Sequence, residues 1–139
     1  MVKRGLLAFV VTFIVWSILD FIIHGVLLQR VYEATSNLWR PMEQMNFVLM
    51  YFVTLVFVVC FVAIYAFLVQ KKSLRAGTAF GALFGIGTGM SMGFGSYTAM
   101  PIPLTLAWGW FLGTLVEAVA AGVIVGAIVK APRDVHSAG

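Results

Sequence analysis

Charged residues are scarce in this sequence. Asp, Glu, Lys and Arg make up 10% of its 139 residues, whereas hydrophobic residues make up 62%. A soluble domain of ordinary composition has about a quarter charged residues. Because so little polar surface cannot coat a soluble particle, the composition predicts one integral membrane domain over residues 1–139.

Cysteine and histidine are nearly absent as well. The one cysteine, Cys60, excludes a disulfide within the chain and a CxxC redox or zinc site. It lies inside an apolar run, so we expect a small core residue. Besides His24 the only histidine is His136, which lies in the tail after the last apolar run, so no catalytic Ser/His/Asp arrangement is apparent. We therefore expect no enzyme, and the sequence indicates no particular cofactor.

Four long apolar runs account for most of the chain. Each is long enough for a membrane-spanning helix, which needs about 20 apolar residues. The sequence therefore predicts an all-α fold, a bundle of four transmembrane helices with spans at about residues 6–28, 46–69, 77–99 and 104–129. The second span is bulky, and we expect it to be the most exposed to lipid. Pro41 is expected to begin its helix, and Tyr32 and Trp39 to anchor the chain at the membrane surface.

The basic residues fall unevenly around these spans. Seven lie on one predicted side, Lys3, Arg4, Lys71, Lys72, Arg75, Lys130 and Arg133, and two on the other, Arg30 and Arg40. Cytoplasmic loops are enriched in Lys and Arg, so both termini are predicted to be cytoplasmic. No basic patch is interleaved with aromatic residues, and we expect the lipid bilayer, not nucleic acid, as the partner of this charge.

Glycine recurs at every fourth position in the third run. In lipid, such spacing lets another helix pack closely. An i, i+4 row advances about 40° per step, so we expect the groove to wind around its helix. Such a helix can touch more than one neighbour, and we expect it to be the axis of the bundle. The expected packing glycines are Gly77, Gly81, Gly85, Gly89, Gly93, Gly109, Gly113, Gly122 and Gly126.

Three ionisable residues interrupt the spans: Asp20 and His24 in the first and Glu117 in the fourth. Each costs at least about 2.5–3.5 kcal/mol at a helix centre, so such residues usually face the bundle interior and mark functional sites. Asp20 and His24 are four residues apart and can pair. Counted from the helix ends, Glu117 is expected about 8 Å deeper than Asp20. Thr88 and Ser91 are expected near this cluster at a similar depth.

Two other interpretations of these residues remain open. A protonated Glu117 could simply tie two helices together by a hydrogen bond. Met90 and Met92, with His24, are weak candidates for a Cu(I) site, because thioethers suit soft metals. Methionine is also an ordinary gap filler between helices.

The first span and the segment after it carry a recognisable pattern. It consists of Leu19-Asp-Phe-Ile-Ile-His-Gly-Val-Leu-Leu28, Tyr32-Glu-Ala-Thr35 and Leu38-Trp-Arg-Pro41. With the glycine-rich third span, this pattern resembles a group of small four-span proteins of bacterial inner membranes that are themselves uncharacterised. The resemblance implies the fold and a multi-pass location in the bacterial inner membrane, and it implies no activity.

Two classes of function follow from these residues. In the first, the Asp20, His24 and Glu117 cluster handles a proton or cation in transport or ligand binding. In the second, the protein is a non-catalytic accessory subunit of a larger membrane complex. A four-helix chain encloses little space, so we expect a homo-oligomer or a subunit of a complex.

Overall fold

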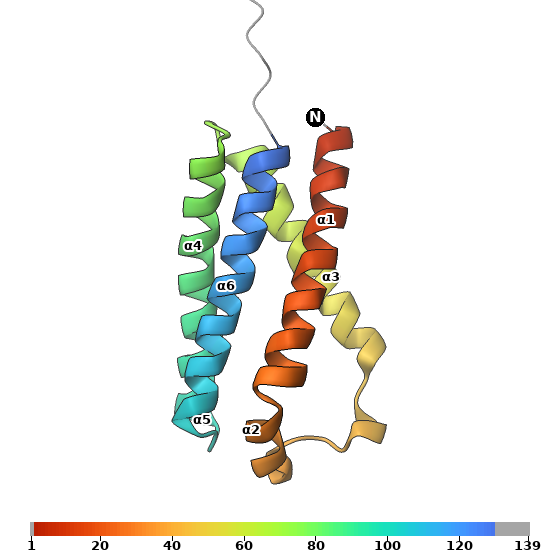
Figure 1. Ribbon diagram of the computed structural model, residues 1–139, viewed down its shortest axis with the longest axis vertical. Coiled ribbons are helices and arrows are strands. Elements are labelled where there is room, and N and C mark those ends of the chain that lie inside the picture. The colour runs from red at the N-terminus through yellow and green to blue at the C-terminus, as the bar shows by residue number, and fades with distance from the viewer. Residues whose placement is uncertain (1, 130–139) are drawn as a thin grey trace, which may run out of the picture.

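The computed structural model describes residues 2–129, and all regular secondary structure among these residues is helical. Lys130, Arg133 and His136 lie outside the described residues. The helices run alternately up and down, so that the N-terminus and the end of the last helix lie at one end (Figure 1). The elements are α1 (Val2–Asp20), η1 (Phe21–Leu27), α2 (Gln29–Ala34), η2 (Ser36–Leu38), η3 (Met42–Gln44), α3 (Phe47–Ala63), η4 (Ile64–Leu68), α4 (Leu74–Met90), η5 (Ser91–Gly95), α5 (Ser96–Ala99) and α6 (Leu104–Ile128).

Three of the described helices are long and apolar enough to cross a membrane. They are Lys3–Leu27, Phe47–Leu68 and Leu104–Ile128. The all-α prediction is therefore confirmed, and the predicted membrane class has support. The third predicted span is not one of the three. Its helical path, α4, η5 and α5, is rich in glycine, which contributes no apolar side chain.

The closest packing in the fold is between α4 and α6. A Cβ on Gly77 would overlap the Gly122 carbonyl oxygen, and one on Gly81 would overlap the Ala118 carbonyl oxygen. The remaining glycines of the row, Gly85, Gly89 and Gly93, likewise have α6 atoms as their nearest neighbours. The groove itself faces a single partner, because α6 follows it along its whole length, and α4 meets a second neighbour, α3, through Phe80.

The most enclosed of the three candidate spans is α6 instead. Within its most apolar stretch 39% of residues are buried, compared with 22% for the first span and 17% for the second. One row of small residues on α6, which includes Gly122 and Gly126, packs against α4, and a second row, Gly109 and Gly113, meets the first helix. The expected bundle axis therefore moves from α4 to α6.

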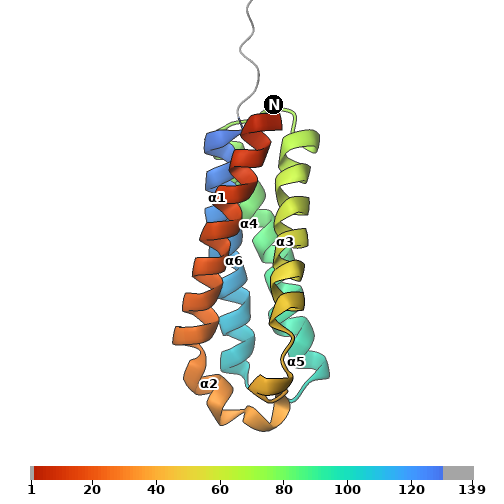
Figure 2. The ribbon, with the colours of Figure 1, turned by 90° about the vertical axis from the view of Figure 1, so that its right-hand side faces the viewer.

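Helix α3 lies at the side of the bundle (Figure 2) and makes aromatic contacts with two neighbours. Phe61 packs on Trp16 of α1, with ring centroids 6.2 Å apart, and on Phe80 of α4 at 4.6 Å. Much of the rest of α3 is exposed apolar surface, in line with the expected lipid contact. Cys60 is exposed on this helix, so the expectation of a core cysteine is wrong.

The segment between the first and second spans covers one end of the bundle. It contains α2 and two short 3₁₀ turns, and α3 begins only at Phe47, where the Asn46 side chain accepts a hydrogen bond from the Leu49 backbone N–H at 2.9 Å. Pro41 therefore precedes a 3₁₀ turn and does not begin the helix, contrary to the prediction. Tyr32 and Trp39 pack with α6 residues in a second apolar cluster, so their contacts lie within the protein.

Candidate functional site

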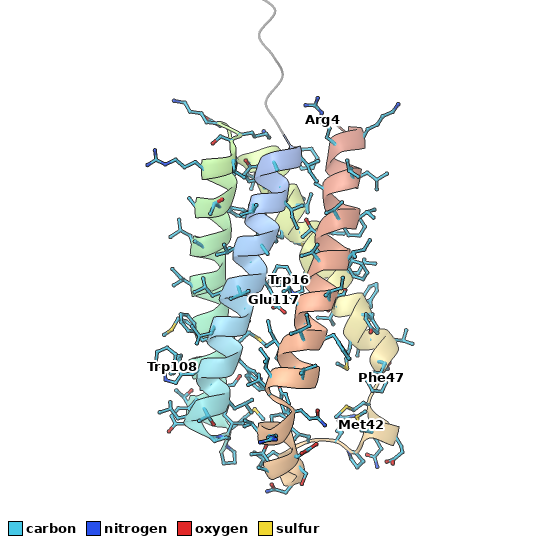
Figure 3. The ribbon with its side chains drawn as sticks, viewed as in Figure 1. Arg4, Trp16, Met42, Phe47, Trp108 and Glu117 are labelled. Atoms are coloured by element: carbon cyan, nitrogen blue, oxygen red, sulfur yellow. The ribbon has the colours of Figure 1, made fainter. Side chains whose placement is uncertain are left out.

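Glu117 is the most deeply buried acid among the described residues. It lies on α6, and its residue is 4% exposed. Its Oε1 atom is buried and has no hydrogen-bond partner. In the view of Figure 3, Glu117 lies in the space between α6 and α1. A buried carboxyl oxygen without a partner carries a desolvation cost that no contact offsets.

The contacts between η1 and α6 place Glu117 relative to Asp20. A Cβ on Gly109 would meet Leu28, and one on Gly113 would meet Ile23 at 2.9 Å. The two helices are antiparallel, so the next residue of this α6 row, Glu117, comes to the level of Leu19 and Asp20. Glu117 was expected to lie about 8 Å deeper than Asp20, and this expectation is wrong. It assumed that Leu28 and Leu104, the outer ends of the two helices, lie at one level. Leu28 instead faces Gly109, so α6 extends beyond the end of η1.

A wide helical turn contributes to this register. The Leu28 backbone N–H donates to the Ile23 carbonyl oxygen at 2.9 Å, which is the i to i−5 bond of a π-helix. Ile23 and Leu28, five residues apart, therefore face the same side of α6. Local π-helical turns of this kind are frequent at functional sites.

Asp20 and His24 form the pair that their spacing predicts. His24 Nε2 lies 3.6 Å from Asp20 Oδ1, and the two side chains are 36% and 47% exposed respectively. This distance allows attraction between charges but is longer than a hydrogen bond. The prediction of one fully buried cluster is thus wrong for residues 2–129, since only Glu117 is enclosed.

Tyr32, Trp39 and Trp110, none of which was predicted as a site residue, complete the surroundings of His24. The Tyr32 hydroxyl lies 2.6 Å from His24 Nδ1, and Trp110 Nε1 donates to the same hydroxyl oxygen at 2.6 Å. Trp39 packs edge-on against Tyr32, with ring centroids 5.5 Å apart. The clustering of aromatic residues in this segment was the available signal, but their partner, Trp110, is far away in the sequence.

The environment of Tyr32 changes its acidity. Burial raises the pKa of Tyr32 from its usual 10.0 to about 12, the hydrogen bond from Trp110 acts in the opposite direction, and the charge of Asp20 adds to the rise. The hydroxyl is therefore neutral at physiological pH and keeps a proton that it can donate.

The two hydroxyl residues expected in the cluster do not hydrogen-bond to it. Thr88 donates to the Phe84 carbonyl oxygen of its own helix at 2.7 Å. Ser91 is exposed, and no hydrogen bond joins either residue to the three ionisable side chains.

Thr12 is fully buried on α1, and its hydroxyl has no hydrogen-bond partner.

The surroundings of His24 also bear on the weak copper hypothesis. Nδ1 faces the Tyr32 hydroxyl and Nε2 faces Asp20, so both ring nitrogens have protein neighbours. Met90 and Met92 are 46% and 55% exposed. Within residues 2–129, no group of three His, Cys, Asp or Glu residues could hold a metal ion.

Comparison of the chain with protein-family models, with curated proteins and with solved structures gave no match.

Proposed function

We propose that the protein crosses the bacterial inner membrane four times with both termini in the cytoplasm. Helices α4, η5 and α5 continue from Leu74 to Ala99, and at about 1.5 Å per residue this path exceeds the roughly 30 Å of the hydrocarbon core. This path packs against α6 through its glycines, so the two helices would lie at the same depth in the membrane. Among the described residues, Lys3 and Arg4 at the start of α1 and Lys71, Lys72 and Arg75 around the start of α4 outnumber Arg30 and Arg40, which lie between η1 and α3. This difference supports the orientation.

We further propose that the protein moves protons through a site formed by Glu117, Asp20 and His24. The observation that carries this proposal is the buried Glu117 oxygen without a partner, at the level of Asp20. A purely structural carboxyl would hydrogen-bond across the helix interface, whereas a carboxyl that binds and releases a proton needs no permanent partner. Acids inside membrane spans commonly serve as proton relays.

A proton suits this site better than a metal cation. A sodium or calcium ion needs several oxygen ligands around it, whereas a proton needs one basic atom. Glu117 supplies one buried carboxyl, and the next acid, Asp20, is already beside His24. The half-exposed Asp20–His24 pair and the buried Glu117 would thus form two proton-binding positions at the same depth in the bundle.

Proton flux in lipid vesicles tests the proposal. The full chain is reconstituted with a pH-sensitive dye inside, and a potassium diffusion potential is imposed. We expect the wild type to acidify or alkalinise the lumen, and Glu117→Gln to abolish this change while retaining its helix content and its elution profile. Glu43→Gln makes the same chemical change at an exposed acid and should retain full flux. No wild-type flux, or equal flux in Glu117→Gln, would overturn the proposal.

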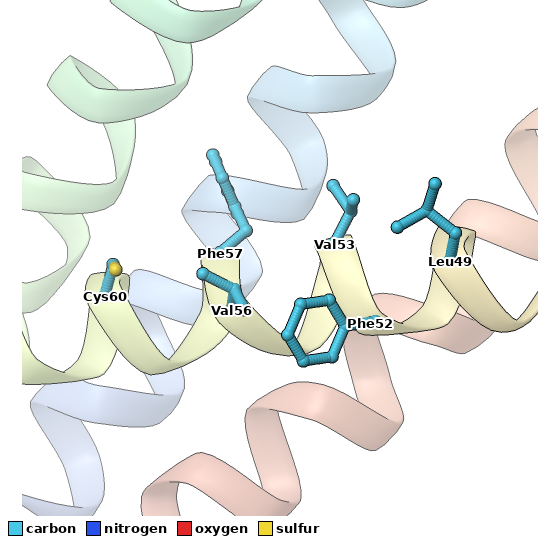
Figure 4. A pocket seen from close by; sticks show the side chains of 6 residues that line it. All are labelled: Leu49, Phe52, Val53, Val56, Phe57 and Cys60. Carbon is cyan, nitrogen blue, oxygen red and sulfur yellow. The ribbon is translucent and has the colours of Figure 1, made fainter.

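An accessory role is the second candidate, favoured by the outer face of α3. An open apolar groove of about 390 Å³ lies there (Figure 4), lined by Leu49, Phe52, Val53, Val56, Phe57 and Cys60. A helix of a second copy or of another subunit would fit such a surface. Lipid chains would fit it as well, so we rank this function below proton transfer.

A further inference from the structure

Tyr32 joins two parts of the chain that are distant in sequence. It lies on α2, eight residues after His24, and it is hydrogen-bonded to Trp110 on α6, 78 residues further along. Its ring packs against His24 and Trp39, with centroids 6.0 Å and 5.5 Å apart. The phenol is thus held from three sides, with its oxygen between the indole nitrogen and the imidazole.

Counting hydrogens assigns the direction of the Trp110 bond and leaves one hydrogen for the bond to His24. An indole N–H can only donate, so the Tyr32 oxygen accepts from Trp110. The hydroxyl hydrogen of Tyr32 is then free to donate to His24 Nδ1, 2.6 Å away. A nitrogen that accepts this hydrogen carries none itself, so the neutral ring holds its proton on Nε2, the atom that faces Asp20.

We propose that Tyr32 is the positioning residue of the proton site, which sets the tautomer of His24 and directs its Nε2–H at Asp20. The role of Tyr32 in proton transfer rests on the proposed function, whereas its effect on the His24 tautomer does not. The other groups around the ring are few: Asp20 is the charged neighbour on the first helix, Tyr32 faces the ring from α2, and the neutral Trp110 reaches it through Tyr32 from α6. Glu117 lies on the same helix as Trp110, at the depth of Asp20.

The arrangement supports a simple, balanced transfer. When the Tyr32 hydroxyl turns away, a hydronium ion gives a proton to Nδ1: its O–H bond breaks, the Nδ1–H bond forms, water leaves and the ring becomes an imidazolium. The Nε2–H bond then breaks as an O–H bond forms on the Asp20 carboxylate, and the ring becomes neutral again. The ring then carries its proton on Nδ1. It resets when the Nδ1–H bond breaks as water accepts that proton and a hydronium ion gives a proton to Nε2, after which Tyr32 donates to Nδ1 once more. No co-reactant other than the proton takes part.

Nitrogen NMR of the full chain in lipid bilayers tests the tautomer. The chain is labelled with ¹⁵N-histidine and carries His136→Gln, so that His24 gives the only signals. We expect an unprotonated Nδ1 and a protonated Nε2 in the neutral ring. Tyr32→Phe should move the Nδ1 signal and allow a mixture of tautomers, whereas Tyr51→Phe, which removes an exposed hydroxyl, should change neither. A protonated Nδ1 in the parent chain, or unchanged signals in Tyr32→Phe, would overturn the assignment.

Flux measurements separate this inference from the proposed function. Tyr32→Phe should slow proton flux about tenfold, because the Nε2–H of His24 is no longer directed at Asp20. Tyr51→Phe should leave the flux unchanged. Trp110→Phe removes one donor without altering Tyr32 and should also shift the Nδ1 signal, which covers the case in which Tyr32→Phe fails to fold. If the tautomer depends on Tyr32 but the wild type has no flux, only the proposed function fails. If Glu117→Gln abolishes flux and Tyr32→Phe leaves both flux and tautomer unchanged, only the inference fails.

Discussion

Gly77 on α4 and Gly122 on α6 face each other so closely that a Cβ on either would overlap the carbonyl oxygen of the other. The contact is therefore backbone against backbone. In lipid, where the hydrophobic effect does not drive helices together, such close packing is a principal source of association. It also holds α6 in the position from which Glu117 faces the first helix.

Adding a methyl group in this interface should therefore destabilise the protein. We expect Gly81→Ala to lower the free energy of unfolding by about 1–3 kcal/mol, because its Cβ would overlap the Ala118 carbonyl oxygen. Gly87→Ala is the matched control on the same helix, since nothing lies within 4 Å of its Cβ, and alanine should be neutral or stabilising there. Unfolding in mixed detergent micelles measures both. Equal stability of the two variants would contradict the described interface.

Replacing Glu117 by a residue of similar size distinguishes a functional carboxyl from a structural one. We expect Glu117→Leu to raise the free energy of unfolding by about 1–3 kcal/mol, because a buried oxygen without a partner is removed. A carboxyl that ties two helices together would instead give a loss of stability. The same unfolding measurement decides between these outcomes.

Thr12→Val serves as the control for Glu117→Leu. It also removes a fully buried hydroxyl without a partner and keeps the side-chain shape. We expect a gain in stability of about 1 kcal/mol from this change. Proton flux should remain in Thr12→Val and disappear in Glu117→Leu.

Tyr32 should ionise at a higher pH than an ordinary tyrosine. Its pKa is about 12 in the folded protein and 10.0 in its usual state. Because the folded state holds the proton more tightly, this contribution to stability is complete below pH 10 and is lost as the pH rises toward 12. Tyrosinate absorbance in wild type minus Tyr32→Phe should show a step near pH 12, and a step near pH 10 would contradict the buried hydrogen-bonded phenol.

Cys60 should react with a thiol reagent without unfolding of the protein. The side chain is exposed on α3 and lines the apolar groove. We expect an apolar maleimide to label it fully in detergent and in native membranes alike, as measured by mass spectrometry. Labelling in detergent and in lipid vesicles of the purified chain, combined with protection in native membranes, would show that another protein segment covers the groove, and the accessory role would gain support.

Much of the helical architecture is a local property of the chain. The apolar runs predict helices, and the boundaries expected for the second and fourth spans differ little from Phe47–Leu68 and Leu104–Ile128. Asp20 and His24 could be paired from their spacing, because residues four apart share a helix face. Thr88 and Ser91 were placed by depth alone, and depth does not determine where a hydroxyl makes its bond.

The positions of the helices relative to one another were harder to predict from the sequence, as Glu117 shows. Its depth relative to Asp20 depends on how far α6 extends beyond η1 and on the wide turn that places Ile23 opposite Gly113. The partner of His24 depends on how the segment after the first span folds back to bring Tyr32 to Trp110.

The sequence by itself determined which segments are helices, which faces carry small residues and which ionisable residues enter the apolar spans. Those properties depend on neighbours within a few positions, where the helical repeat sets angle and height. Only the tertiary structure decided that α6 lies between α4 and α1, that Glu117 is enclosed while Asp20 is not, and that Tyr32 meets His24. Such relations depend on the offset and rotation of one helix against another, which are set by side-chain contacts between residues far apart in the chain.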